Sequence, residues 1–322
     1  MHYEKFFAPV GIIATIFLSL KLISATFSLL RPANVSKYLH KGKVSWAIIT
    51  GATDGVGRAL AFEFAKKGFN IIIHGRNSLK LSTVDKELQA KYPTIKTLIF
   101  PCDASRNLSN SDPFIKNLKS LQDLHITVLV NNVGGMGCLP PSDLYKPLQA
   151  YTAEEVDTVI NVNVGFMTQL TRILIPFLDH SGDENNNRQP SLILNMASLA
   201  AQGSPYVTVY TATKAFAETF TKSLEMEMQV EQKHIDVRAL LVGEVGSGSH
   251  VVDETFLTPS AANYASAAMK RLGSGEVVTA GCLGHWLAAS MVAIIPRSVA
   301  RRMYIHTLLA RKAKHESRLE EN

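Results

Sequence analysis

The chain has 322 residues, of which 46% are hydrophobic, so it can bury one large core or two small ones. Its net charge of +6 comes from the two ends: residues 1–43 hold six Lys or Arg and one acid, residues 297–322 hold seven and three, and the body between them is slightly acidic. This distribution argues against nucleic acid as a partner and favours a membrane surface. The three cysteines lack paired or metal-type spacing, which suits a reducing compartment: Cys102, Cys138 and Cys282.

The N-terminal segment contains an apolar run from Phe6 to Leu30 with one charge, Lys21. A helix of this length can cross a bilayer core of about 30 Å, although a central Lys costs roughly 2.5 to 3.5 kcal/mol. A signal peptide that ends near Leu20 is the alternative. The sequence predicts a membrane anchor over residues 1–34 and one folded domain over residues 35–322. Four basic residues after the run should keep this domain in the cytosol: Arg31, Lys37, Lys41 and Lys43.

The folded domain opens with a strand, a glycine turn and a helix. Val44 to Thr50 is an apolar run of strand length, rich in β-branched residues. The turn Gly51-Ala52-Thr53-Asp54-Gly55-Val56-Gly57 follows, and a helical pattern begins at Arg58. Glycines here let the backbone approach a pyrophosphate, which the positive end of the helix stabilises. The pattern predicts a dinucleotide-binding turn.

A second strand, Asn70 to His74, is followed by Arg76. In dinucleotide-binding folds an acid at this place binds the ribose 2′-hydroxyl, whereas an arginine accommodates a 2′-phosphate. Arg76 therefore favours NADPH over NADH. Against this, Asp54 puts a negative charge near that phosphate, and loop arginines are commonly only solvated.

Two further strands end in polar residues. Thr97 to Phe100 leads to Asp103, and Thr127 to Val130 leads to Asn132 and Gly134. Strands that alternate with helices indicate right-handed crossovers and a parallel sheet, whose ligand sites lie beyond the carboxyl ends of its strands. The predicted fold class is α/β: a doubly wound parallel sheet (Rossmann) in a single domain, with an N-terminal transmembrane helix.

Tyr210 and Lys214 stand four residues apart in a helical segment, so their side chains emerge on one face, and Ser198 lies twelve residues before Tyr210. A tyrosine normally keeps its proton until about pH 10, and a neighbouring ammonium lowers that pKa by stabilising the phenolate. Such a pair also occurs by chance in many chains. It indicates acid–base chemistry only when its context agrees.

The order of the motifs resembles the short-chain dehydrogenase/reductase family. The motifs are T-G-A-T-D-G-V-G, C-D-A, N-N-V-G, N-V-N-V with Asn163, then Ser198 and Y-T-A-T-K, and they extend roughly from Val44 to His250. Five motifs in order are far more specific than one. The apolar N-terminus, N-N-V-G in place of N-N-A-G, and the hydrophobic C-terminal segment resemble the very-long-chain 3-oxoacyl-CoA reductases and their hydroxysteroid dehydrogenase relatives.

The resemblance implies a catalytic role for four residues. Tyr210 would give its proton to the substrate carbonyl oxygen, and Ser198 would orient that oxygen by a hydrogen bond. Lys214 would lower the pKa of the tyrosine and bind the nicotinamide ribose. Asn163 would hold a water that links Lys214 with solvent.

The resemblance also implies a set of cofactor contacts. The glycine turn would wrap the pyrophosphate, and the ends of the next strands would bind the adenosine half. The implied residues are Gly51, Gly55, Val56 and Gly57 for the pyrophosphate, Arg76 for the 2′-phosphate, Asp103 for the adenine, Asn132 for the adenosine side, Tyr210 and Lys214 at the nicotinamide end, and Val245 and Ser247 in the loop that closes over it.

Two residues and one spacing depart from the family pattern. Val242 stands where a proline is usual, which costs rigidity in the following loop. Ser247 replaces a threonine but keeps the hydroxyl. The spacing from Ser198 to Tyr210 is one residue shorter than in close relatives, which can shift Ser198 relative to Tyr210. None of these changes removes a reacting group.

The C-terminal third is expected to set the substrate. Residues 249–270 resemble a mobile lid, in which Phe256, Leu257 and Tyr264 can form an apolar wall for a lipid. The hydrophobic segment 277–295 is either a second membrane-dipping helix or a buried element of the domain. No metal site is expected, because the acidic run His180 to Pro190 fits an exposed insertion and the ten histidines show no ligand spacing.

The sequence thus predicts an NADPH-dependent reductase of a ketone on a lipid-like substrate. The favoured reaction converts 3-oxoacyl-CoA to 3-hydroxyacyl-CoA in very-long-chain fatty acid elongation, at the endoplasmic reticulum membrane with the catalytic domain facing the cytosol. One alternative is a hydroxysteroid or secondary-metabolite carbonyl dehydrogenase/reductase. Another is a catalytically idle, membrane-bound assembly subunit. A homodimer or a complex with elongation proteins is a further expectation.

Overall fold

The computed structural model describes residues 34–106, 114, 118–182, 189–248, 250–273 and 275–320, with six isolated positions before residue 34. The anchor predicted over residues 1–34 therefore lies almost wholly outside the described residues. Within these described ranges, no helix is both long and apolar enough to cross a membrane.

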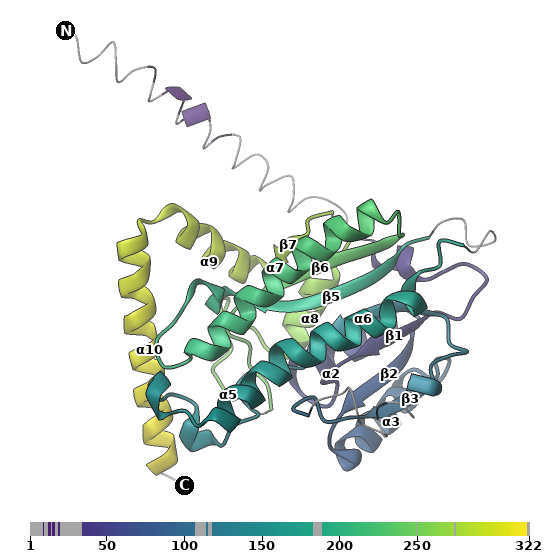
Figure 1. Ribbon diagram of the computed structural model, residues 1–322, viewed down its shortest axis with the longest axis horizontal. Helices are drawn as coiled ribbons and strands as arrows, with labels where there is room; N and C mark the ends of the chain where they lie inside the picture. The colour runs from purple at the N-terminus through teal and green to yellow at the C-terminus, as the bar shows by residue number, and fades with distance from the viewer. Residues whose placement is uncertain are drawn as a thin grey trace.

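A seven-stranded sheet forms the centre of the domain (Figure 1). The spatial order of the strands is β3-β2-β1-β4-β5-β6-β7, and every neighbouring pair is parallel. This is the strand order of a doubly wound dinucleotide-binding sheet with one strand added, so the predicted α/β fold is confirmed. The strands are β1 (Trp46–Ile49), β2 (Asn70–Gly75), β3 (Thr97–Pro101), β4 (Ile126–Asn131), β5 (Ser191–Ser198), β6 (Ile235–Val242) and β7 (Val278–Ala280).

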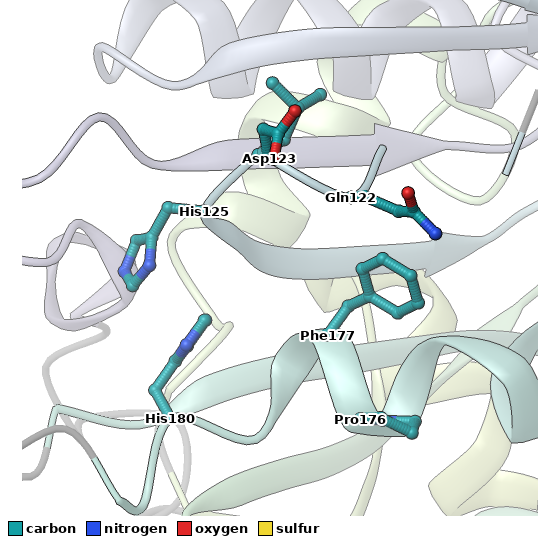
Figure 2. Close-up of a pocket in the computed structure, with 7 residues that line it drawn as sticks. Gln122, Asp123, His125, Pro176, Phe177 and His180 are labelled. Atoms are coloured by element: carbon teal, nitrogen blue, oxygen red, sulfur yellow. The ribbon is translucent and has the colours of Figure 1, made fainter. Parts of the chain in front are cut away.

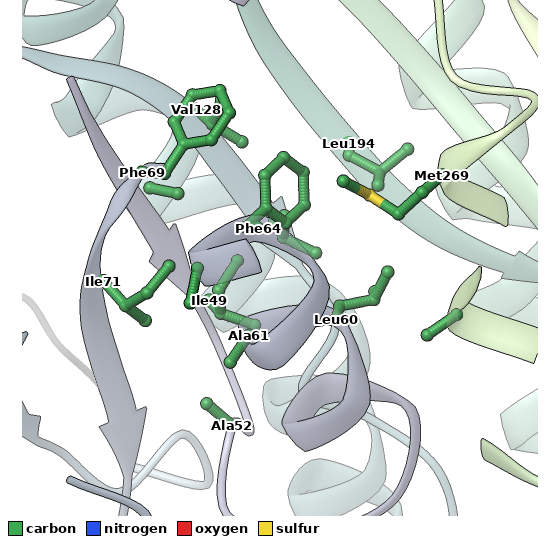
Figure 3. Packing of buried hydrophobic residues seen from close by; sticks show 14 of the residues in the cluster. Ile49, Ala52, Leu60, Ala61, Phe64, Phe69, Ile71, Val128, Leu194 and Met269 are labelled. Carbon is green, nitrogen blue, oxygen red and sulfur yellow. The ribbon is translucent and has the colours of Figure 1, made fainter. Parts of the chain in front are cut away.

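Helices cover both faces of the sheet, as right-handed crossovers require. Successive residues of a strand point to opposite faces, so β1 divides its side chains between two cores. Ala47 and Ile49 pack with α2, α3 and α8, whereas Trp46 and Ile48 pack with α6 and α7. Figure 3 shows the first core, in which Phe64 of α2 lies over the sheet. These helices are α2 (Gly55–Lys66), α3 (Ser78–Lys91), α6 (Phe166–Leu178), α7 (Thr208–Val230) and α8 (Ala261–Met269).

The predicted lid, residues 249–270, divides into two different parts. Its described residues before Ser260 are irregular and expose Phe256 and Leu257, and a β-bridge joins Ser260 to Gly246. From Ala261 onward the chain forms α8, which packs against α2 with Tyr264 fully buried. The second half of the segment expected to form a lid is thus a packed helix, whose many alanines let it lie close to the core.

The hydrophobic segment 277–295 also divides. β7 pairs with β6 inside the sheet, and α9 (Leu283–Ile294) starts with the buried residues Gly284 and His285. The first part is thus a buried element of the domain. The other side of α9 carries a row of exposed apolar residues at helical spacing: Leu283, Leu287, Met291 and Ile294. We call this set the α9 apolar row. The long helix α10 (Arg297–Glu320) follows and stands at the side of the domain (Figure 1).

Candidate active site

The turn between β1 and α2 lies at the carboxyl edge of the sheet. Gly51 and Gly55 have φ angles of 64° and 56°, a left-handed conformation that favours glycine. At Gly57 an added Cβ would lie 2.3 Å from Nδ2 of Asn132 and from the carbonyl oxygen of Gly51. Asp54 caps α2 by accepting a hydrogen bond of 2.7 Å from the Gly55 N–H. The turn is a tight cradle at a helix N-terminus, and its shape fits a dinucleotide pyrophosphate.

Asn132 holds this cradle in place. Its backbone N–H donates to Oγ1 of Thr50 at 2.8 Å, and its side-chain Nδ2 donates to the Thr50 carbonyl oxygen at 2.9 Å. The side chain of Val56 is partly buried and packs against the core. The side-chain amide of Asn132, which we expected beside the adenosine, therefore binds the turn and shapes the cradle.

Arg76 and Asp103 follow the neighbouring strands β2 and β3. Arg76 is exposed. Burial raises the pKa of Asp103, but hydrogen bonds from Ser105 and the charges of Arg76 and Arg106 outweigh it and hold the pKa below its usual value. Arg76 and Asp103 are thus close enough for their charges to interact, at the place where dinucleotide folds recognise the ribose.

The predicted catalytic residues come together at the end of β5. Ser198 is the last residue of that strand, and its Oγ donates to the Val242 carbonyl oxygen at 3.0 Å. Tyr210 and Lys214 lie in the first two turns of α7. The ammonium of Lys214 is buried, donates to the Met196 carbonyl oxygen at 3.0 Å and lies 5.7 Å from the centre of the Tyr210 ring.

Asn163 lies in a π-helical turn, η5 (Asn161–Gly165), between α5 (Ala153–Ile160) and α6. Such turns are frequent at functional sites. The buried amide accepts a hydrogen bond of 2.7 Å from the Gly135 N–H and donates to the Gly135 carbonyl oxygen at 3.0 Å. A Cβ at Gly134 would lie 2.8 Å from Oδ1 of Asn163 and 3.2 Å from Nζ of Lys214. Because Gly134 has no side chain, the asparagine and the lysine face the same small space.

The pKa values of the pair differ from the expectation. Burial raises the pKa of Tyr210, the Ser198 hydroxyl lowers it as a hydrogen-bond partner, and Tyr145 raises it. Lys214 is not among the groups that shift the pKa of Tyr210, and desolvation lowers the pKa of Lys214 itself to about 8. Tyr210 therefore holds its proton at neutral pH, and Lys214 is the group whose charge changes near that range.

His285 of α9 supports the loop that follows β6. The Gly243 N–H donates to Nδ1 of His285 at 3.1 Å, so Nε2 carries the proton that bonds to the Glu244 carbonyl oxygen at 3.2 Å. Burial lowers the pKa of His285 and keeps the ring neutral. The loop that follows Val242, the residue at the usual proline position, is thus held by a histidine instead. Sequence reasoning missed this residue, although it is a polar exception in an apolar run.

The same loop closes toward the glycine turn. Ser247 lies beside Gly55, where an added Cβ would be 3.3 Å from the serine Cβ. Val245 packs partly against the core on the side of α2 and α8. The two positions expected at the nicotinamide end are therefore held between the cradle and the domain core.

A polar chain inside the core was also missed. Nδ2 of Asn131 donates to Asn195 Oδ1 and to Thr171 Oγ1, each at 2.8 Å, and Nδ2 of Asn195 donates to Thr221 Oγ1 at 2.9 Å. All four side chains are buried. These hydrogen bonds join β4 and β5 to α6 and α7. Since α7 carries Tyr210 and Lys214, and α6 follows the turn with Asn163, the bonds fix the relative positions of the predicted site residues.

Helix α10 runs beside the loop after β6 and the segments near Tyr210. One face of it contacts both the loop after β6 and the segments around Tyr210. These contacts are the Arg311–Glu244 ion pair at 2.6 Å, Lys312 Nζ at 5.6 Å from the ring of Tyr206, the hydrogen bond of 2.6 Å from His315 Nε2 to the Pro141 carbonyl oxygen, and the His315 ring at 5.3 Å from that of Tyr145. We call this group of aromatic and basic side chains beside Tyr210 the mouth of the site; Arg311 is paired with Glu244 and Lys312 with Glu316.

The family model for short chain dehydrogenases matches residues 45–254, more than half of the chain. The matched region contains the glycine cradle, Asn163, Ser198, Tyr210 and Lys214. The chain belongs to the short-chain dehydrogenase family, and it is an oxidoreductase that acts on carbonyl and hydroxyl groups.

Among curated relatives, the chain is 31% identical to the very-long-chain 3-oxoacyl-CoA reductase of Ajellomyces capsulatus, with 88% of this chain and 79% of the relative covered. The same enzyme of Candida albicans is 30% identical, over 85% and 77% of the two chains. "Putative steroid dehydrogenase 3" of Caenorhabditis elegans is also 30% identical and covers 99% of both chains. The resemblance predicted from the motifs is thus confirmed.

Solved structures share the fold. A 7beta-hydroxysteroid dehydrogenase superposes with a TM-score of 0.65 at 19% identity, over 81% of this chain and 97% of that one. A short-chain dehydrogenase from Sphingobium yanoikuyae in complex with NADPH gives 0.60 at 22% identity, over 79% and 96%. A 3-ketoacyl-(acyl-carrier-protein) reductase from Brucella melitensis complexed with NADH gives 0.58 at 25% identity, over 74% and 96%.

The buried ammonium predicts a pH dependence. From the roles expected of the pair, reduction should need Tyr210 protonated and Lys214 charged, because the ammonium would stabilise the phenolate that forms. Since the pKa of Lys214 is lowered to about 8, kcat/KM for reduction should fall as pH rises through about 8. In Lys214→Arg the guanidinium keeps its charge, so this fall should disappear although the overall rate is lower. Initial rates across the neutral to alkaline range measure both profiles. A wild-type profile without a fall near pH 8 would contradict the assignment.

Proposed function

We propose that this protein is an NADPH-dependent reductase that converts 3-oxoacyl-CoA to 3-hydroxyacyl-CoA in very-long-chain fatty acid elongation. The observation that carries the proposal is the grouping of Ser198, Tyr210 and Lys214 at the end of β5, beside the glycine cradle. The names of two relatives that are about 30% identical support the substrate.

Bound NADPH would supply the hydride that reduces the carbonyl carbon. The residues of the protein orient and protonate the carbonyl oxygen of the substrate. Ser198 turns its hydroxyl from the Val242 carbonyl toward the substrate oxygen and orients it, and Tyr210 donates its proton to that oxygen as negative charge develops there. Lys214 stabilises the tyrosinate, and Asn163 faces the same space as the lysine and lies on the path by which a proton returns.

The aromatic and cationic mouth supports an acyl-CoA as substrate. The region from residue 297 onward carries a net charge of +4, and α10 brings Lys312 and His315 to the mouth. A coenzyme A carries several phosphate charges that such a helix can attract. The exposed Phe256 and Leu257 offer apolar contacts to an acyl chain.

A hydroxysteroid is the second candidate substrate. The steroid dehydrogenase relative from Caenorhabditis elegans covers 99% of both chains, which is a fuller match than the reductases give. The exposed Phe256 and Leu257 also suit the apolar rings of a sterol. The idle assembly subunit remains the alternative of another class.

We further propose that the protein works at the endoplasmic reticulum membrane, with the domain in the cytosol. The apolar run of residues 6–30, the basic flank behind it and the α9 apolar row support this proposal. Arg297, Arg301 and Arg302 follow α9 directly and are exposed, as expected of a helix end that meets anionic headgroups.

The substrate is tested with full-length protein purified in detergent. Wild-type protein should oxidise NADPH with a long-chain 3-oxoacyl-CoA, and Tyr210→Phe should lower kcat at least about 100-fold because the proton donor is lost. Tyr92→Phe, at the end of α3, is the matched control and should keep full activity. Turnover of a ketosteroid alone would favour the second candidate. NADPH binding without turnover of either ketone would favour the idle subunit.

Arg76 predicts the choice of cofactor. In Arg76→Asp the ratio of kcat/KM for NADPH to that for NADH should fall roughly 10- to 100-fold, because a charge-assisted contact to the 2′-phosphate is replaced by repulsion. Arg172→Asp, on the exposed side of α6, is the control and should leave the ratio unchanged. An unchanged ratio in Arg76→Asp would show that another group binds the 2′-phosphate of NADPH.

The α9 apolar row predicts contact with lipid near Trp286. The chain has two tryptophans, and Trp46 is buried in β1, so it serves as an internal reference. In full-length protein reconstituted into vesicles with anionic, brominated lipids, the fluorescence of Trp286 should be quenched. Leu287→Glu with Met291→Glu should remove this quenching. Leu79→Glu with Val230→Glu, which changes exposed apolar residues elsewhere, should not. Equal quenching in all three proteins would contradict the contact.

A further inference from the structure

We infer that His40, His125 and His180 form a binding site for a zinc ion at the edge of the sheet opposite to Tyr210. One ring nitrogen of each histidine lies within 4.8 Å of those of the other two. The three rings approach one another closely, with centroid distances of 4.9, 5.3 and 4.0 Å. This site is independent of the proposed function, and it differs from the expectation that the chain has no metal site.

The parallel sheet brings these residues together. His125 directly precedes β4, and His40 lies shortly before β1, which pairs with β4. The Trp46 N–H donates to the His125 carbonyl oxygen at 3.0 Å, which fixes the two strand entries side by side. His180 follows the end of α6, whose chain returns to this same edge. The histidines are far apart in the chain, so no spacing motif reveals them.

Backbone carbonyls orient two of the three rings. Nε2 of His40 lies 3.1 Å from the Pro190 carbonyl oxygen, and Nε2 of His180 lies 2.9 Å from that of Ile126. A carbonyl oxygen only accepts, so each of these nitrogens carries the proton and Nδ1 of the same ring carries the lone pair. Metal-binding histidines are typically held in this way, with the second ring nitrogen donating to a carbonyl.

The distance between His40 and His125 suits a small adjustment around an ion. Nδ1 of His40 and Nε2 of His125 are 2.8 Å apart, which without metal is an N–H···N hydrogen bond. Nitrogen ligands of a tetrahedral zinc ion at about 2.0–2.1 Å are about 3.3 Å from one another. The pair therefore has to spread by only about half an ångström to bind the ion. His125 then changes tautomer: it gives up its Nε2 proton and takes one up on Nδ1, so the neutral ring can bind the metal through Nε2.

A cavity provides the fourth coordination position. It has a volume of about 470 Å³ and its walls include both His125 and His180 (Figure 2). Their two rings face each other on one side, with Phe177 and Gln122 on the other. A water molecule in this cavity can complete a tetrahedral site. Three imidazoles with neither thiolate nor carboxylate favour zinc over calcium or magnesium.

The ion would tie three parts of the fold at their entry points. His40 belongs to the segment that leads from residue 34 into β1, next to Tyr38, whose hydroxyl donates to Asp236 at 2.8 Å. His125 directly precedes β4 and His180 follows α6, both on the domain body. Zinc would thus fasten the beginning of the folded domain to its sheet, on the side away from the reacting residues.

The test uses untagged, full-length protein in detergent, stripped with a chelator and dialysed. Zinc should then bind with a stoichiometry of one per chain and raise Tm by a few degrees. Cobalt in its place should give the intense visible bands of tetrahedral coordination.

Variants assign the ligands. His125→Gln and His180→Gln should lose the tetrahedral cobalt bands and the zinc-dependent rise in Tm, while His306→Gln, on the exposed side of α10, should keep both. NADPH-dependent turnover serves as the folding control, since the site is distant from Tyr210. Wild-type protein without tetrahedral cobalt bands would overturn the inference, as would bands that survive in both cluster variants. In that case the three histidines form only a hydrogen-bonded group.

Discussion

All seven strands run in one direction, and this constraint organises the rest of the molecule. The carboxyl ends of parallel strands meet at one edge, so residues from distant parts of the chain become neighbours there. The glycine cradle after β1, Asn132 after β4, Ser198 on β5 and the loop after β6 are all brought to this edge. The amino ends meet at the opposite edge in the same way, and there the sheet brings His40 and His125 together.

Buried polar groups hold the strands and helices of the candidate active site in their relative positions. The chain of Asn131, Asn195 and the two threonines fixes β4 and β5 against α6 and α7. Lys214 donates to a carbonyl of β5 from α7, which sets Tyr210 beside Ser198. Burial of that ammonium is costly, and the lowered pKa of Lys214 is the consequence. Burial of Tyr210 itself raises the pKa of its hydroxyl, so the tyrosine keeps its proton.

The C-terminal part of the chain completes the site from outside the sheet. His285 of α9 holds the loop after β6, and Arg311 of α10 pairs with Glu244 in that loop. Helix α9 thus supports the loop after β6, and helix α10 borders the mouth of the site. The α9 apolar row lies on the other side of the same helix, so the proposed membrane contact would adjoin the substrate entrance.

The sequence by itself determined the fold class, the glycine cradle and the grouping of Ser198, Tyr210 and Lys214, because these depend on local patterns: apolar runs, glycines at a turn, and an i, i+4 pair. Only the tertiary structure decided what depends on packing between distant segments. It turned half of the predicted lid into the core helix α8, reversed the expected pKa shift of Tyr210, and assigned Asn132 to the turn. It also revealed His285 and the three-histidine cluster. Desolvation and contacts between residues far apart in the chain leave no periodic signal, and for this reason they could not be predicted from the order of residues.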